Sequence, residues 1–469
     1  MSIEARPAEG RAPARIGWQD LLICGAALAA LALPTPVGEA PELVRAVALV
    51  IFAIGYWATG RMPEHVVALV FFLAAMLLSV APPQVIFAGF AAPAFWLVVG
   101  GLIIGGAVDH TGFGQRLARF MVGRAAGSYA KMIAAILVVD LALAFIMPSP
   151  MGRVALLLPI AMAIAGEAGF RPGQKGWNGI VLATVFGSYM GPTTILTANV
   201  PNNILLGAAD SLHGIKITYF EYLGVHFPIL GLLKTLILGL VIIVFWADRP
   251  GLAPTAKERQ PWRPVERRIA IILAAALLLW MSDIWHGVAP AWISLTAGLA
   301  LIAPGLGVLS GREFESCLKL RPLIYVAGIF GLGAIAADTG LGNFLARQLL
   351  TAFPLTPGAD ATNFGLLALG NVALGLITAM PSIPAVVAPL AGDLAAAMDV
   401  PVITVLMTTV LGFSTAIFPY QVPPLLLGLY MGKVPFREGV RLGATLAAIT
   451  GLVLFPLDFL WWRWLGYFG

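Results

Sequence analysis

Long apolar stretches recur from one end of this chain of 469 residues to the other. Two of them are ELVRAVALVIFAIGYWATG at 42–60 and LGVHFPILGLLKTLILGLVIIVFW at 223–246. Each approaches or exceeds the roughly 20 residues that an α-helix needs to cross a hydrocarbon core about 30 Å thick. Only 11% of the residues are charged, whereas soluble domains contain roughly 25%. The sequence therefore predicts an all-α polytopic membrane protein.

The remaining composition argues against several classes of function. We attribute the net charge of +5 to basic residues in cytoplasmic loops, and we expect no nucleic-acid partner. The two cysteines, Cys24 and Cys317, offer no metal-ligand spacing, so we expect no metal site and no cofactor. The sequence contains no G-x-x-x-x-G-K-[ST] motif for ATP, and its catalytic residue types are scattered. An integral membrane enzyme is the alternative from another class, but we expect no enzymatic activity.

Basic residues in the loops predict the orientation of the chain. Arg6, Arg11 and Arg15 place the N-terminus in the cytoplasm by the positive-inside rule. Basic loops follow at 116–131 and 249–268, where the count of spans returns the chain to the cytoplasm. This count predicts about 11 transmembrane helices, two re-entrant hairpins and an external C-terminus. We expect the protein to lie in the inner membrane of a bacterium.

The segment FIMPSPMGRVALLLPIA at 145–161 places two prolines around a serine inside an apolar region. Proline interrupts a helix because it lacks a backbone N–H group. The arms on either side, 131–147 and 153–166, are 17 and 14 residues long, which is short for complete spans at about 1.5 Å per residue. We therefore predict a re-entrant hairpin near 131–166. A second hairpin is predicted near 362–398, which contains the similar segment ITAMPSIPAVVAPLAG.

The two halves of the chain share short motifs. TGFGQRLAR at 111–119 and TGLGNFLAR at 339–347 are identical at six of nine positions. Further pairs follow in the same order: MPS at 147–149 and 380–382, then VPNN at 200–203 and VPPL at 422–425. The loop count puts the two copies on opposite sides of the membrane, which predicts inverted-topology repeats as in many secondary transporters. Chance similarity between membrane helices rich in Gly and Pro is the alternative.

This repeat divides the chain into four parts. They are N-terminal scaffold helices at 1–84, a first repeat at 85–246, a cytoplasmic basic linker at 247–268 and a second repeat at 269–469. Within the repeats, Gly and Pro interrupt the predicted helices near 177–208 and 400–431. Unwound backbone at membrane depth needs a partner or a water-filled cavity, and such breaks are typical of substrate sites. The alternative is a kinked structural helix whose Ser and Thr hydroxyls satisfy its own carbonyls.

A hairpin with a serine at its tip and a helix broken at a proline turn, both repeated after inversion, resemble the divalent anion:sodium symporter (DASS) family over residues 85–469. The resemblance implies a secondary active transporter for a small anion, such as a di- or tricarboxylate or sulfate. It also implies elevator-type movement and a homodimer in the lipid bilayer. A cation/proton antiporter or an arsenite-type permease of the same ion transporter superfamily is the rival function.

Hairpin tips of that family read Ser-Asn-Thr, and this chain departs from the pattern. The first tip reads Ser149, Pro150 and Met151, and the second contains Ser382 followed by Ile383. In the family these tips hold substrate carboxylates and supply oxygens to sodium. The departures leave open a substrate with fewer carboxylates, proton coupling or counter-anion exchange. We predict that sodium dependence is weak or absent, with Na⁺ or H⁺ as the coupling ion.

The breaks and the resemblance together predict the binding residues. Those for the substrate are Ser149, Pro150, Arg153, Thr193, Thr194, Asn202, Ser382, Ser414, Thr415 and Gln421. Those for a cation are Ser149, Thr197, Asn199 and Asn202.

Arg153 and Asp140 are ionisable residues of the first hairpin. Arg153 stands about one helical turn beyond Ser149, where it is placed to pair with an anionic substrate. The alternative is a structural partner, such as a cluster of carbonyls at a helix end or an acidic side chain. Asp140 and Asp393 lie farther along the hairpin arms, toward aqueous mouths, where we expect solvated or structural roles; proton relay is the alternative.

Overall fold

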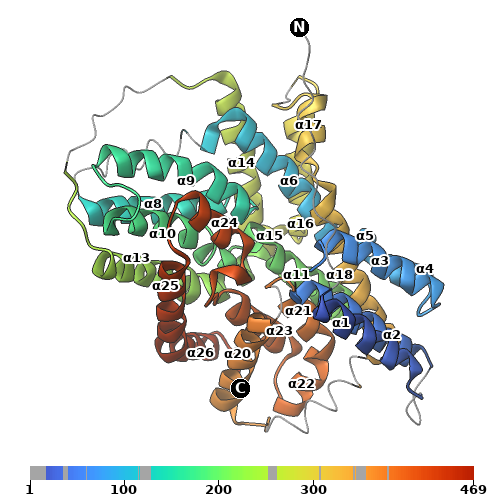
Figure 1. Cartoon of the computed structure of the whole chain (residues 1–469). Coiled ribbons are helices and arrows are strands. Elements are labelled where there is room, and N and C mark those ends of the chain that lie inside the picture. The colour runs from blue at the N-terminus through green and yellow to red at the C-terminus, as the bar shows by residue number, and fades with distance from the viewer. Residues whose placement is uncertain are drawn as a thin grey trace.

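The structure is a computed structural model, and it describes residues 17–34, 41–59, 61–114, 116, 128–251, 261–305, 308–341, 344, 355–377 and 380–468. Every regular element in these residues is a helix, so the predicted all-α class is confirmed (Figure 1). Within them, three helices are long and apolar enough to cross a membrane: Pro150–Glu167, Tyr219–Phe245 and Phe436–Trp464. The pair Gly311–Cys317 and Leu320–Ala336, bent by 47°, makes a fourth if it is one span. The number of spans stays a prediction.

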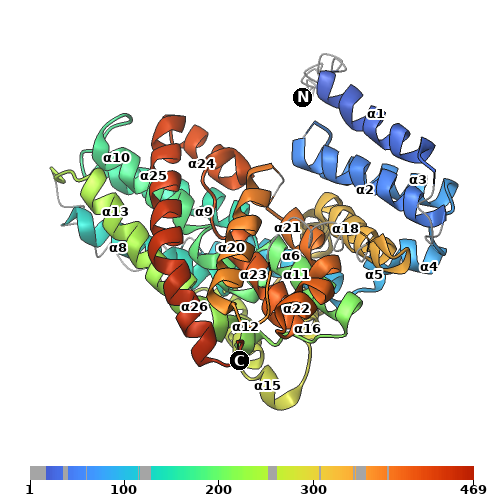
Figure 2. The same ribbon diagram turned by 90° about the horizontal axis from the view of Figure 1, so that it is seen from below.

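The N-terminal helices pack with one helix of the second half in a hydrophobic cluster that α6 (Pro93–Thr111) and α11 (Val200–His213) also join. They are α1 (Trp18–Ala32), α2 (Pro41–Thr59), α3 (Glu64–Leu77), α4 (Pro83–Ile86), α5 (Ala88–Ala91) and the distant α18 (Leu320–Asp338). Figure 2 shows this group at one side of the molecule. A glycine lets α3 and α18 approach closely, since a Cβ added at Gly328 would lie 2.6 Å from the Cβ of Ala68.

A larger hydrophobic cluster contains most of the other helices. Those of the first half are α6 (Pro93–Thr111), α8 (Tyr129–Ala144), α9 (Pro150–Glu167), α10 (Lys175–Gly187), the 3-10 helices η1 (Gly191–Thr194) and η2 (Leu196–Ala198), α11 (Val200–His213), α12 (Tyr219–His226), the π-helix η3 (Phe227–Leu233) and α13 (Lys234–Phe245). The helices α8 and α9 form the first hairpin. The helices α10 and α11 are the two halves of the first broken helix.

The second half contains the same kinds of element in the same order. After α14 (Pro264–Met281), α15 (Asp283–His286), α16 (Pro290–Ile302), α17 (Gly311–Cys317) and α18 come α20 (Asp360–Ile377), α21 (Ser382–Val387), η4 (Ala388–Leu390), α22 (Ala391–Met398), α23 (Val402–Phe413), η5 (Pro419–Gln421), α24 (Pro423–Met431), α25 (Phe436–Ile449), the π-helix η6 (Thr450–Leu454) and α26 (Phe455–Trp464). The order hairpin, broken helix and long helix with a π-helical segment therefore occurs twice. In Figure 1 the hairpin α8–α9 lies in the upper part and α20–α22 in the lower part, with α11 and α23 between them.

The start of the shared nine-residue motif has the same local structure in both halves. The hydroxyls of Thr111 and Thr339 donate to the carbonyl four residues earlier, at 2.8 and 2.7 Å. Each threonine precedes a glycine, Gly112 or Gly340, with a φ of +70°, a conformation that glycine adopts without strain. Most of the remaining residues of both motifs lie outside the described ones. The local match supports a repeat, and its inverted orientation stays a prediction.

Two predicted boundaries need correction. The helix α14 begins at Pro264, so the last residues of the predicted linker 247–268 are helical, while 252–260 lie outside the described residues. The second arm of the first hairpin, α9, is 18 residues long rather than 14, because Pro150 starts the helix instead of ending the tip. Arm length therefore no longer distinguishes a re-entrant arm from a complete span at this position.

Candidate functional site

The tip of the first hairpin is the start of a helix. The Ser149 hydroxyl oxygen accepts a hydrogen bond from the backbone N–H of Gly152 at 3.1 Å and so caps α9. Pro150 occupies the first position of α9, where its missing N–H has no helical acceptor in any case. The sequence Ser-Pro thus forms a regular helix N-terminus, with the positive end of its dipole at the tip.

Arg153, in the first turn of α9, is completely buried. Its guanidinium donates to backbone carbonyls of three segments: Met147 at the hairpin tip, Ser188 after α10 at 2.8 and 3.2 Å, and Ala198 before α11 at 3.2 Å. These bonds hold the hairpin tip against the first break. They correspond to the structural alternative for this residue, and direct contact with substrate stays a prediction.

Asp140 of α8 is also completely buried, so the expected position near an aqueous mouth was wrong. The Ser188 hydroxyl donates to its Oδ1 at 2.5 Å, and its Oδ2 has no hydrogen-bond partner. The carboxylate fits there because α10 presents Gly187, where a Cβ would lie 2.7 Å from Oδ2. Asp140 and Arg153 interact electrostatically, so an acid and a base meet at the end of α10.

The first break extends from the end of α10 to the start of α11, through η1 and η2. The hydroxyls of Thr193 and Thr194 donate to nearby carbonyls of Met190 and Gly191, at 2.5 and 2.7 Å. The carbonyl of Thr193 accepts from the hydroxyl of Tyr222 at 2.8 Å. Both threonine protons are therefore used to satisfy unwound backbone.

Asparagine side chains line the start of α11. Asn199 is the N-cap residue, but its side chain does not cap the helix. In the orientation that suits its neighbours, its amide donates to Ala198 and accepts from the backbone of Thr193. The amide of Asn202 donates to the Ile195 carbonyl at 2.7 Å, while the side-chain oxygens of Asn202 and Asn203 lack partners. The buried N-terminus of α11 thus retains unused polar atoms.

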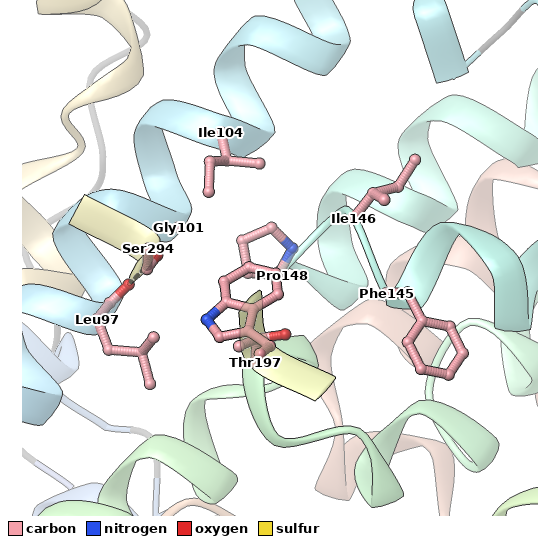
Figure 3. Close-up of a pocket in the computed structure, with 9 residues that line it drawn as sticks. Leu97, Gly101, Ile104, Phe145, Ile146, Pro148, Thr197 and Ser294 are labelled. Carbon is pink, nitrogen blue, oxygen red and sulfur yellow. Dashed lines mark hydrogen bonds between the residues drawn. The ribbon is translucent and has the colours of Figure 1, made fainter. Parts of the chain in front are cut away.

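A small pocket, with room for about one water molecule, adjoins the hairpin tip and the break (Figure 3). Figure 3 shows Pro148 of the tip between α6, which carries Leu97 and Gly101, and Thr197 of η2. Its other lining residues are Ile104, Phe145, Ile146, Trp280 and Ser294. The lining is largely apolar, and Thr197 is the predicted ligand that it contains.

The second hairpin differs from the first. Ser382 is the first residue of α21 and is buried, but its hydroxyl caps no helix and has no hydrogen-bond partner. The turn before it contains Met380 and Pro381. A serine thus follows a similar Met-Pro pair in both hairpins and acts as a helix cap in the first hairpin alone.

The polar residues of the second break form hydrogen bonds within the protein. Ser414 is the C-cap of α23, and its carbonyl accepts from the Lys234 ammonium at 2.8 Å. The Thr415 hydroxyl accepts from the same ammonium at 3.3 Å. The side-chain oxygen of Gln421 accepts from the backbone of Ile417 and Phe418 at 2.8 and 2.7 Å, and its nitrogen donates to Gly375 of α20 at 2.6 Å.

The two broken helices meet at their interruptions. The hydroxyl of Tyr189, in the first break, donates to the carbonyl of Phe413, the last residue of α23, at 2.7 Å. The structure therefore brings Ser149, Arg153 and the predicted residues 193–202 together, with the second break adjoining them. Ser382 lies on α21, which packs on α11, so it approaches this group from the other hairpin.

Sequence reasoning missed two buried charges, Lys234 and Asp458. Each is a single ionisable residue inside an apolar segment of a long helix. That signal alone marks a functional position in a membrane protein. The structure describes no group of three or more His, Cys, Asp or Glu side chains that could hold a metal ion.

Comparisons with known proteins agree with a transporter fold. A "Membrane protein" from Cupriavidus necator is 25% identical, and the alignment covers 96% of this chain and 93% of that protein. "Dicarboxylate transporter 2.2, chloroplastic" from Arabidopsis thaliana is 23% identical over 98% of this chain and 89% of its own length. The crystal structure of the YdaH transporter from Alcanivorax borkumensis superposes with a TM-score of 0.56, at 15% identity, over 95% of this chain and 97% of that chain.

The family model "CitMHS: Citrate transporter" matches residues 47–412, which is well over half of the chain. The matched region includes both hairpins, the whole first break and α23 up to its penultimate residue. The family is one of membrane transporters and not of enzymes, and the relative from Arabidopsis thaliana is also named a transporter. The chain therefore belongs to the citrate transporter family.

Proposed function

We propose that this protein is a secondary active transporter for a small anion with two or three carboxylates, in line with its family and with the relative named a dicarboxylate transporter. The observation that carries the proposal is the meeting of two helix N-termini. α9 begins after Ser149 and α11 after Asn199, and the side chain of Arg153 spans from one start to the other. Helix N-termini attract anions, and broken helices in transporters direct them at anionic substrate groups.

The polar groups at this place suit carboxylates. The start of α11 lacks a side-chain cap, and the amides of Asn202 and Asn203 are buried beside it. A carboxylate bound there accepts hydrogen bonds from backbone N–H groups at the start of α11, and the dipoles of α9 and α11 compensate its charge. The unpartnered side-chain oxygens of Asn202 and Asn203 are acceptors, so they suit a hydroxyl group of the substrate rather than its carboxylate. A substrate with a second carboxylate has the other helix start within reach. The DASS-like placement of Ser149 and Asn202 is part of the same proposal.

The proposed mechanism is an elevator-type movement in a homodimer. Most residues of one hydrophobic cluster lie on α1 to α4 and α18, whereas a second cluster contains most of the hairpins and breaks; α6 and α11 contribute to both. Such a division supports a scaffold and a moving body, because two clusters can slide against each other without unpacking either. We place the protein in the inner membrane of a bacterium with its N-terminus in the cytoplasm.

A cation/proton antiporter or arsenite-type permease is the second candidate. The predicted breaks at 177–208 and 400–431 offer no acidic residue at their interruptions, which by itself argues against an antiporter. In the structure, Asp140 reaches the first break from α8 through the hydroxyl of Ser188. A buried carboxylate beside a helix break is the feature that favours this second candidate.

A thermal-shift screen of the purified protein tests the proposal. Its ligands are mono-, di- and tricarboxylates, sulfate and arsenite, each with and without sodium. A ligand that binds the native state alone raises the melting temperature. We expect a di- or tricarboxylate to give the largest rise, and Asn202→Ala to reduce it. A rise with arsenite, and none with any carboxylate, would contradict the proposal in favour of the second candidate.

A further inference from the structure

Lys234 is a buried lysine near the middle of an apolar helix. It is the first residue of α13, directly after the π-helix η3, within the long helix Tyr219–Phe245. Its side chain is 1% exposed. An ammonium group at membrane depth is costly unless it faces a cavity or a partner. The proposed substrate site at the first break makes no use of this residue.

The ammonium lies on uncharged oxygens at the second break. Its nitrogen donates to the Ser414 carbonyl at 2.8 Å and to the Thr415 hydroxyl at 3.3 Å. Because Ser414 caps α23, its carbonyl belongs to the negative end of that helix dipole. The Thr415 hydroxyl gives its own proton to Leu411 at 2.8 Å, so its lone pairs face the ammonium. These are contacts that a bound metal cation would make at the same place.

Asp458 of α26 supplies the balancing negative charge. It is completely buried, and neither of its carboxylate oxygens has a hydrogen-bond partner. It interacts electrostatically with Lys234, the one charged group found to act on it in the described part of the chain. A nearby cation stabilises the ionised form of a buried carboxylate that has no hydrogen-bond partner.

In the part of the chain that the structure describes, Lys234 is the charged group that acts on Asp458. A second basic residue, His226 of α12, lies near Trp462, on the same helix as Asp458, with the two rings 5.6 Å apart. His226 is buried, with one ring nitrogen unpartnered and the other 3.3 Å from the sulfur of Met407. A π-helical segment precedes each member of the pair, η3 before Lys234 and η6 before Asp458. Such segments occur frequently at functional sites.

We propose that the Lys234 ammonium occupies a cation-binding position at the C-terminal end of α23. In the absence of the ammonium, the Ser414 carbonyl and the Thr415 hydroxyl offer oxygens to a small inorganic monovalent cation, and the buried carboxylate of Asp458 balances its charge from a longer distance. Half-helix C-termini and unwound carbonyls coordinate Na⁺ in transporters with broken helices, and lysine brings the same charge with three N–H donors. The second break therefore carries a tethered cation.

The substitution Lys234→Met tests this assignment, because methionine keeps the apolar stem and removes the charge. The melting temperature of the purified full-length protein is measured in sodium, potassium and choline chloride at equal ionic strength. We expect the wild type to melt at the same temperature in all three salts. Lys234→Met should melt lower in choline and rise saturably as sodium is added. Lys216→Met, at an exposed lysine, is the matched control and should behave as the wild type.

Two further variants decide the remaining outcomes. Lys234→Arg keeps a cation and should stay indifferent to the salt, and Lys234→Met with Asp458→Asn should lose the response to sodium. A folded Lys234→Met that melts equally in the three salts overturns the proposal. Lys234→Met could fail to fold in any salt. Recovery of the folded yield when Asp458→Asn is added would then support the proposal, because it shows that Lys234 is needed for its charge. Failure to recover the yield would assign Lys234 to packing and overturn the proposal. The readout involves no transported anion, so it is independent of the proposed function.

Discussion

The first half of each broken helix ends in the same way. α10 and α23 each end at a serine, Ser188 or Ser414, whose carbonyl accepts from a buried basic side chain. Arg153 supplies the donor in the first half and Lys234 in the second. Each base has a buried carboxylate for its charge. A break at membrane depth is thus stabilised twice by the same means, a fixed cation at the negative end of a half-helix.

The polar side chains beyond this serine differ between the halves. In the first break, Asn202 and Asn203 keep side-chain oxygens without partners. In the second, Gln421 places its oxygen and its nitrogen on backbone groups of the protein. The Arg153 cation belongs to the hairpin, whereas the Lys234 cation belongs to a long helix. From this comparison we expect the first break to bind a ligand and the second break to hold its own shape.

The largest effect is expected for Arg153→Gln, which tests the cation of the first break. The change leaves Asp140 without its base and the carbonyls of Met147 and Ser188 without this donor, so we expect the free energy of unfolding to fall by about 3–5 kcal/mol. Arg153→Lys keeps the charge but does not span all three carbonyls, and should lose less. Folded yield and melting temperature measure both variants.

The double change Arg153→Gln with Asp140→Asn is the control for Arg153, because it removes both charges together. It should recover part of the lost yield. If Arg153→Gln and Arg153→Lys both give a normal folded yield but lose much of their substrate affinity, then Arg153 binds the substrate directly. The parallel between the two breaks would then fail.

The next effect is expected for Gln421→Ala in the second break. The change removes the hydrogen-bond partner of the backbone N–H groups of Ile417 and Phe418 and of the Gly375 carbonyl. We therefore expect the free energy of unfolding to fall by about 1–3 kcal/mol. Gln421→Glu keeps the acceptor and loses the donor, so it should lie between. The KM of uptake should not change in either variant. A raised KM at an unchanged melting temperature would restore Gln421 as a substrate ligand, as the sequence predicted.

The positions of the breaks were predictable because their causes are local. Gly191 and Pro192 interrupt the helix wherever it packs, since proline lacks a donor and glycine disfavours a helix. The same reasoning located the hairpin tip at Pro148 and Pro150. For Pro150 it missed that proline is also favourable at the first position of a helix, which is why α9 starts earlier than predicted.

The partners of the buried charges were not predictable, because they depend on how distant helices face each other. Ser188 lies 48 residues from Asp140, and Ser414 lies 180 residues from Lys234. The spacing of apolar residues along a soluble helix shows which of its faces is buried. In these membrane helices nearly every face is apolar, so the spacing does not show which faces meet. The single lysine in the apolar run was a signal for a special position without any indication of its partner.

A smaller effect is expected for Asn202→Ala, which tests the ligand-binding character of the first break. We expect about a tenfold loss of affinity for the anion, or about 1.4 kcal/mol, measured as KM in proteoliposomes. Asn371→Ala is the matched control, because Asn371 is also buried, makes one side-chain hydrogen bond and has an unpartnered oxygen, but lies on α20. It should lose similar stability and keep its affinity. Equal affinity losses in both variants would remove the distinction between the halves.

The smallest effect is expected when sodium is replaced by potassium or choline at fixed pH during counterflow in proteoliposomes. Sodium needs several hard oxygens, and a second cation at either break would meet a fixed one. Arg153 holds the carbonyls of Ser188 and Ala198 in the first break, and Lys234 holds that of Ser414 in the second. Like charges at such short range disfavour each other strongly in a dry interior. Uptake should therefore change little. A steep, saturable sodium requirement with a Hill coefficient of about two would mean that both basic side chains leave their carbonyls during transport, and the two breaks would then be alike as ion sites.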